Sequence, residues 1–142
     1  VAQALVRMAE AAGLDAVVVD PRRAFATADR FPGVPIVTEW PEEALGRIGL
    51  RPRDAVVTLA HDAKIDDPAL AAALRVGCFF VGALGSRRSH AARLERLRRE
   101  GVGEAELARI QGPVGLAIGA VTPGEIATSI LAAVVQALRQ PA

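Results

Sequence analysis

Short runs of apolar, β-branched residues alternate along the chain with longer segments whose apolar positions recur at helical spacing. The short runs are bounded by polar residues, proline or glycine, which is typical of strands buried in a parallel sheet. They predict strands at Asp15–Asp20, Val34–Val37, Asp54–Leu59 and Cys78–Val81. Because strands and helices alternate, the sequence predicts an α/β fold, a Rossmann-like parallel sheet with helices on both faces.

Several of the predicted helices have recognisable ends. Pro41 stands in the first turn of a helix that ends at Ile48, and Ser86 precedes a charged helix that runs to about Glu100. Thr122 and Glu125 form a capping box ahead of a long C-terminal helix. Further helices are expected over Val1–Ala12, from an N-cap at Asp67 with Pro68 at N1 to about Arg75, and over Glu104–Ile110.

In a Rossmann-like unit, Val1–Ala12 corresponds to the first helix and Asp15–Asp20 to the second strand. The first strand and its glycine-rich turn would then precede Val1 and be absent from this chain. Because the usual strand order is 3-2-1-4-5, the absent strand would lie in the middle of the sheet. We therefore predict that residues 1–142 form a single, N-terminally truncated Rossmann-like domain.

Composition narrows the classes of partner. Hydrophobic residues make up 51% of the 142 residues but aromatic residues only 4%, and 17 basic residues nearly balance 16 acidic ones. This balance argues against a general nucleic-acid binder and favours a small anionic ligand. The single cysteine, Cys78, rules out an internal disulfide framework. No apolar run reaches the roughly 18 residues of a membrane span, so a cytoplasmic protein without membrane contact is expected.

The segment GALGSRRSH follows a predicted strand and opens a predicted helix. Gly82 and Gly85 permit a tight turn, and Ser86 can cap the helix so that its first N–H groups face outward. With Arg87 and Arg88 beside them, these groups would bind a phosphate or pyrophosphate. A solvated strand-to-helix turn explains the same residues, and both interpretations stay open.

Two further places are candidates for ligand contact. Asp20 ends a strand where an acid can accept hydrogen bonds from ribose hydroxyls, or it can form a turn and pair with Arg22. Gly112, Gly115 and Gly119 lie in a second loop that opens a helix, and either ligand approach or close helix-to-sheet packing explains them. Because no nucleophile, base and orienting group occur together, no catalytic residue and no metal site are expected.

The order of four segments is more specific than any one of them. These segments are DAVVVDPRRAFATADRFPG, VVTLAHDAKIDDPAL, FFVGALGSRRSHAARLERLRREG and GPVGLAIGAVTPGEIATSIL. Together they resemble the XdhC/CoxI family, whose members are accessory proteins of xanthine dehydrogenase, carbon monoxide dehydrogenase and related molybdenum hydroxylases. The resemblance covers the whole chain and implies the family's C-terminal Rossmann-like domain. Gln111 stands where a histidine is expected and Ala117 where an acid is expected, which would weaken ligand contacts at those positions.

The resemblance implies a chaperone that binds molybdenum cofactor (molybdopterin), keeps it for sulfuration and delivers it to an apo molybdenum hydroxylase. A nucleotide form of the cofactor is a further ligand that it allows. A cofactor nucleotidyltransferase, a cysteine desulfurase and a second copy of the chain are further partners that it allows. Two other functions stay open from the residues: an NAD(P)-dependent oxidoreductase domain that uses Asp20 for the ribose, and a dimerisation module without a ligand.

Overall fold

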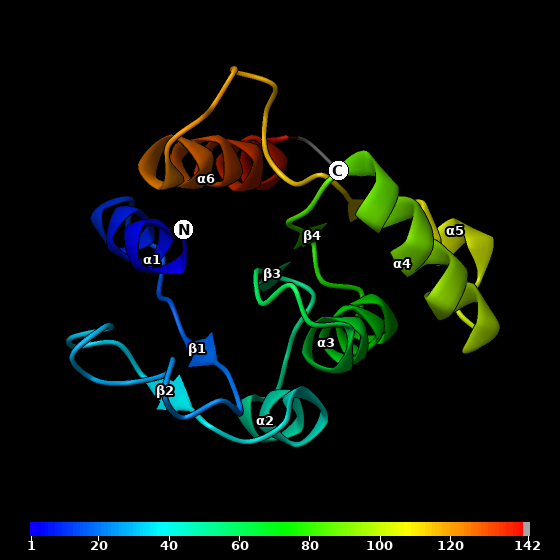
Figure 1. Ribbon diagram of the computed structural model, residues 1–142, viewed down its shortest axis with the longest axis horizontal. Helices are drawn as coiled ribbons and strands as arrows, with labels where there is room; N and C mark the ends of the chain where they lie inside the picture. The colour runs from blue at the N-terminus through cyan, green and yellow to red at the C-terminus, as the bar shows by residue number, and fades with distance from the viewer. Residues whose placement is uncertain (141–142) are drawn as a thin grey trace.

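The computed structural model describes residues 1–140, which form helices and short parallel strands in alternation (Figure 1). The helices are α1 (Ala2–Ala11), α2 (Pro41–Ile48), α3 (Ala63–Val76), α4 (Arg87–Arg99), α5 (Glu104–Leu107) and α6 (Pro123–Arg139). The strands are β1 (Val18–Val19), β2 (Ile36–Val37), β3 (Ala55–Thr58), β4 (Phe80–Ala83) and β5 (Ile110–Gln111). The predicted α/β, Rossmann-like class is confirmed.

The strands form two separate parallel sheets. One sheet has the order β1-β2 and the other the order β3-β4-β5. In the Rossmann order 3-2-1-4-5-6, β2 and β1 take the places of strands 3 and 2, and β3, β4 and β5 those of strands 4, 5 and 6. The boundary between the two sheets therefore falls where strand 1 of that order belongs.

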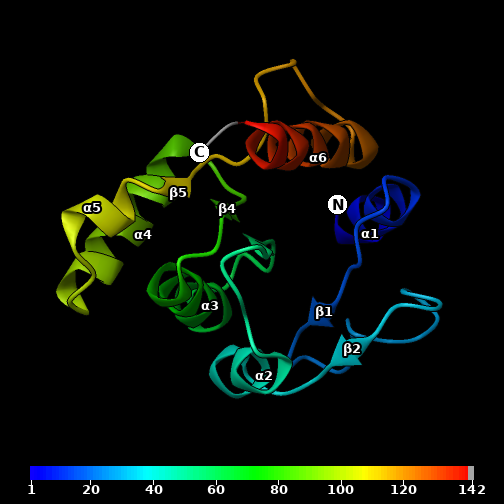
Figure 2. The ribbon, with the colours of Figure 1, turned by 180° about the vertical axis from the view of Figure 1, so that it is seen from behind.

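Helices cover the sheets on two opposite faces (Figures 1 and 2). On one face, α6 packs against α1 and buries Ile130 and Val134 with Phe80. On the other face, α3 and α4 bury Leu70 and Leu97 with strand residues of β4 and β5. Alternate residues of β4 serve the two clusters, because successive side chains of a strand point to opposite faces.

Local sequence explains most helix ends. Helix α2 begins at Pro41 as predicted and ends at Gly49, whose φ of 74° lies in the left-handed region that glycine favours. Ser86 caps α4 by accepting a hydrogen bond from the Ser89 N–H. Thr122 and Glu125 form the predicted capping box of α6, with both reciprocal hydrogen bonds present.

The predicted start of α3 is wrong. The helix begins at Ala63, with Asp62 as its N-cap and a hydrogen bond from the Lys64 N–H to the Asp62 carboxylate at 3.0 Å. Asp67 and Pro68 lie inside the helix, which holds because Asp66 and Asp67 are buried and bound to groups outside it. Tertiary contacts of the two aspartates thus override the helix-start signal of the Asp-Pro pair.

Two other boundaries differ from the predicted ones. The helix expected over Glu104–Ile110 ends at Leu107, because Ile110 pairs with Val81 and begins β5. The strand predicted at Cys78–Val81 lies two residues later, since Phe80–Ala83 is in register with Ala55–Thr58. Cys78 is buried beneath it, as the sequence indicates.

Candidate functional site

The turn after β4 and the loop after β5 leave the same edge of the three-stranded sheet. Because β4 and β5 are parallel, with Gly82 opposite Gln111, both chains continue in the same direction. The Val114 N–H then donates to the Ala83 carbonyl oxygen at 3.0 Å. The His90 ring packs on Gly112, with no room for a Cβ atom between them. The two glycine-rich segments predicted from the sequence are therefore neighbours at the carboxyl edge.

Glycines in these segments allow close packing. A Cβ on Gly82 would overlap Val114, and one on Gly115 would overlap the Ser129 side chain. Gly115 also has a φ of 113°, which L side chains rarely adopt. Gly119 has a φ of 75° with open space around it, so its requirement is conformational alone.

Arg87 and Arg88 are exposed at the start of α4. Within residues 1–140, neither guanidinium forms a salt bridge. Ser86 satisfies the Ser89 N–H, while the first N–H groups of a helix have no intrahelical carbonyl. The turn thus presents two arginine side chains beside a positive helix end, which is an arrangement that attracts anions.

Behind this turn lies Arg93, a buried arginine that the sequence patterns did not single out. Its Nη2 donates to the Leu84 carbonyl oxygen at 3.1 Å, and its Nη1 lies 3.2 Å from Nδ1 of His90. Burial lowers the pKa of Arg93, and burial together with the Arg93 charge lowers the pKa of His90. Arg93 stands four residues before the buried Leu97, so its helical spacing could have indicated an inward side chain.

Two buried aspartates of α3 complete a polar network beneath the carboxyl edge. The Asp66 carboxylate accepts hydrogen bonds from the N–H groups of Ala60 and His61, at 3.3 and 3.1 Å, just after β3. Asp67 pairs with Arg96 of α4 at 2.7 Å. Burial raises the pKa of Asp66, while Arg93 counteracts that rise. The network fixes the turns that follow β3 and β4 relative to each other.

Asp20 lies at the end of β1, on the other sheet. Both of its carboxylate oxygens are engaged by Arg22, through Nε at 3.0 Å and Nη2 at 2.9 Å. This is the local ion pair that the sequence left open as an alternative to a ribose contact. The hydrogen bond to Asp20 raises the pKa of Arg22, and the more distant carboxylates of Asp62 and Asp66 add to that effect. The end of β1 therefore lies within electrostatic range of the start of α3.

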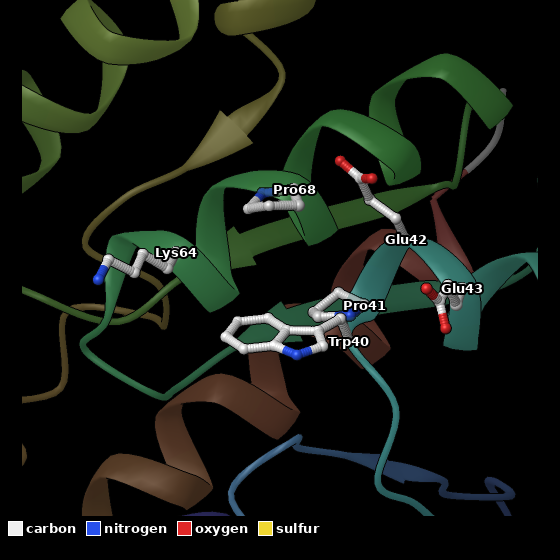
Figure 3. A pocket seen from close by; sticks show the side chains of 6 residues that line it. All are labelled: Trp40, Pro41, Glu42, Glu43, Lys64 and Pro68. Atoms are coloured by element: carbon white, nitrogen blue, oxygen red, sulfur yellow. The ribbon is translucent and has the colours of Figure 1, made fainter.

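A pocket of about 250 Å³ lies elsewhere, between the first turns of α2 and α3 (Figure 3). Trp40, half exposed, and Pro41 border it from one side, and Pro68 and Lys64 border it from the other. Glu42 and Glu43 also line it, so its carboxylates do not suit a phosphate. None of the residues predicted for the site lines this pocket.

Two searches of residues 1–140 bear on other functions. No group of three or more histidine, cysteine or acidic side chains there is arranged to hold a metal ion. No helix in the same range is long and apolar enough to cross a membrane.

Comparison with known proteins gives consistent matches. The chain is 32% identical over 139 residues to a Bacillus subtilis protein named as a probable xanthine dehydrogenase component, covering 97% of this chain and 40% of that protein. It is 40% identical over 80 residues to the molybdenum cofactor insertion chaperone PaoD of Escherichia coli, covering 56% of this chain and 25% of that protein.

A solved structure matches as well. A crystal structure described as a xanthine dehydrogenase from Bacillus halodurans superposes with a TM-score of 0.81 at 31% identity, covering 96% of this chain and 39% of that one. The chain thus spans less than half the length of each of these relatives. A family model described as the XdhC Rossmann domain matches residues 1–134. The chain belongs to the XdhC Rossmann domain family.

Proposed function

We propose that this domain binds molybdenum cofactor through its phosphate at the turn after β4 and serves as a chaperone domain for a molybdenum hydroxylase of the xanthine dehydrogenase type. The observation that carries the proposal is the pair of exposed arginines, Arg87 and Arg88, without carboxylate partners in the described residues, at the start of α4. Two relatives named for xanthine dehydrogenase and for cofactor insertion support the same function.

Residues of this turn suit the anionic end of the cofactor. The positive end of α4 and the two guanidinium groups can supply charge-assisted hydrogen bonds to phosphate oxygens. Ser86 caps the helix and Gly85, with a φ of 144°, gives the chain its bend before that cap. Arg93 holds the turn from beneath through the Leu84 carbonyl oxygen. The residues present therefore fit a phosphate.

The loop after β5 would form the second wall. Gly112 and Gly115 bring its backbone against His90 and Ser129, and Gly119 shapes the approach to α6. In this proposal Gly82 serves the site by letting Val114 pack close to β4. Asp20 would face the ligand from the far side only if its pairing with Arg22 is shared or exchanged.

The cofactor supplies molybdenum redox chemistry in the hydroxylase that receives it, so this proposal assigns no catalytic step to the chain. We infer that the domain holds the cofactor during terminal sulfuration and then transfers it to the apo-hydroxylase. The names of the relatives support an accessory role, and the sulfuration step rests on the family resemblance.

The test is retention of molybdopterin by the Arg87→Ala/Arg88→Ala variant, measured by gel filtration and pterin fluorescence. Each charge-assisted hydrogen bond contributes about 1.5–3 kcal/mol. The double variant should therefore bind at least about 100-fold more weakly, at 1.4 kcal/mol per tenfold change. The matched control is Arg75→Ala/Arg99→Ala, which removes two exposed arginines away from the turn. Equal binding by the two double variants would remove Arg87 and Arg88 from the site.

A further inference from the structure

The boundary between the two sheets is the most unusual feature of this fold. Strands β1 and β3 are the inner strands of their sheets, and neither pairs with the other. Each therefore presents one unpaired backbone edge in the interior of the sheet layer, where parallel sheets ordinarily continue. Unpaired N–H and C=O groups on such an edge are a template for another strand.

Hydrogen bonds show which backbone groups are free to pair. In β1, the N–H groups of Val18 and Asp20 donate toward β2, to the carbonyl oxygens of Pro35 and Val37, each at 3.0 Å. Since alternate residues of a strand direct their backbone groups to opposite edges, Val17 and Val19 direct theirs away from β2.

The same alternation holds in β3. The Thr58 carbonyl oxygen accepts a hydrogen bond from the Leu84 N–H at 3.0 Å, so Thr58 faces the β4 side. The alternate residues Val57 and Leu59 then direct their backbone groups to the opposite edge. Two rows of free backbone groups thus border the interruption, one from each sheet.

The helix layers do not share this interruption. On one face α1 packs against α6, and on the other face α2 packs against α3. In each pair, one helix belongs to the part of the chain around β1 and β2 and the other to the part around β3 to β5 (Figures 1 and 2). Both helix layers are therefore continuous across a place where the sheet between them is not.

We propose that one parallel strand, contributed by a segment of the same gene product joined to α1 at Val1, inserts between β1 and β3 and completes a single six-stranded sheet. The place is that of strand 1 in the order 3-2-1-4-5-6. Val1 packs against the apolar cluster that contains Phe80 and Ile130, so a strand that ends there reaches the interior of the fold. The strand would be apolar on both faces, because helices cover both.

This inference does not depend on the cofactor, but it has a consequence for the site. A strand parallel to β1 and β3 ends at the same edge as they do, so its following turn would lie between Asp20 and the residues after Leu59. The phosphate turn after β4 would then be one of two turns that border a shared crevice, as in doubly wound sheets generally.

Amide hydrogen exchange measured by NMR tests the proposal in two proteins: the 142-residue chain and the longer native gene product that contains it. The readout is the exchange of the Val19 and Val57 N–H groups, which border the interruption. The matched controls are the Val18 and Val56 N–H groups, which face existing partner strands. Val19 and Val57 should exchange at least about 100-fold more slowly in the longer protein, whereas the controls change little.

Three results would overturn the proposal. The first is equally fast exchange of Val19 and Val57 in both proteins, which means that no strand inserts. The second is strong protection in the monomeric 142-residue chain, which means that β1 and β3 pair directly. The third is protection of the 142-residue chain that rises with its concentration and matches that of the longer protein, which assigns the strand to a second copy.

Discussion

Replacement of Arg93 by methionine should destabilise the domain more than replacement of any exposed arginine. The side chain is only 5% exposed and donates to the Leu84 carbonyl oxygen and approaches His90 Nδ1. Methionine keeps much of the apolar volume but removes the charge and both contacts. It also leaves the buried carboxylate of Asp66 without a cation that counteracts its desolvation.

The magnitude follows from these losses. Two hydrogen bonds from a charged donor contribute about 1.5–3 kcal/mol each, and removal of one partner from a buried charge network costs about 3–5 kcal/mol. We expect Arg93→Met to lower the free energy of unfolding by about 3–5 kcal/mol, a large share of the roughly 5–15 kcal/mol typical of a domain. Arg99→Met, at an exposed position of the same helix, should change it by less than about 0.5 kcal/mol.

Urea denaturation followed by circular dichroism measures both variants, with a common slope as the check on two-state behaviour. The Arg93→Met protein should also show a higher pKa of His90 by NMR, since the Arg93 charge lowers it. A loss below about 1 kcal/mol for Arg93→Met, or equal losses for the two variants, would refute the argument that the buried network holds the turns after β3 and β4.

Two further predictions concern packing and pH. Gly82→Ala should destabilise the domain by about 1–3 kcal/mol, because the new Cβ overlaps Val114. Gly46→Ala, with open space in α2, should stabilise it by about 0.5–1 kcal/mol in the same urea experiment, and the opposite order would contradict the packing around β4. Burial and Arg93 lower the pKa of His90, so its contribution to stability is complete above the unfolded value of about 6.5 and is lost as the pH falls from there toward the folded pKa. The stability of wild type relative to His90→Gln should therefore decrease between pH 7 and pH 5, and a constant difference would contradict this.

The elements that the sequence predicted well are those whose ends depend on local chemistry. Pro41, Ser86 and the Thr122–Glu125 capping box each fix a helix start through groups within a few residues of one another. The neighbouring positions of the turn after β4 and the loop after β5 also follow from the sequence, because consecutive parallel strands end at one edge.

The residues that the sequence did not assign correctly depend on distant partners. Asp67 has the local pattern of a helix cap, but its pairing with Arg96, 29 residues away, holds it inside α3. Arg93 resembles the many surface arginines around it, and only its contacts with Leu84 and His90 show that it is buried. Asp20 fits two local roles equally well, and the orientation of Arg22 decides which one the structure adopts.

The central claim is that this domain binds molybdenum cofactor by its phosphate at the turn after β4. The most direct measurement is an equilibrium titration of the longest native chain that contains these residues, with molybdopterin and, separately, with NADH. The account predicts saturable, one-to-one binding of molybdopterin that weakens as salt is added, since exposed arginines supply the charge. Saturable binding of NADH without binding of molybdopterin would contradict it and would favour the nicotinamide alternative.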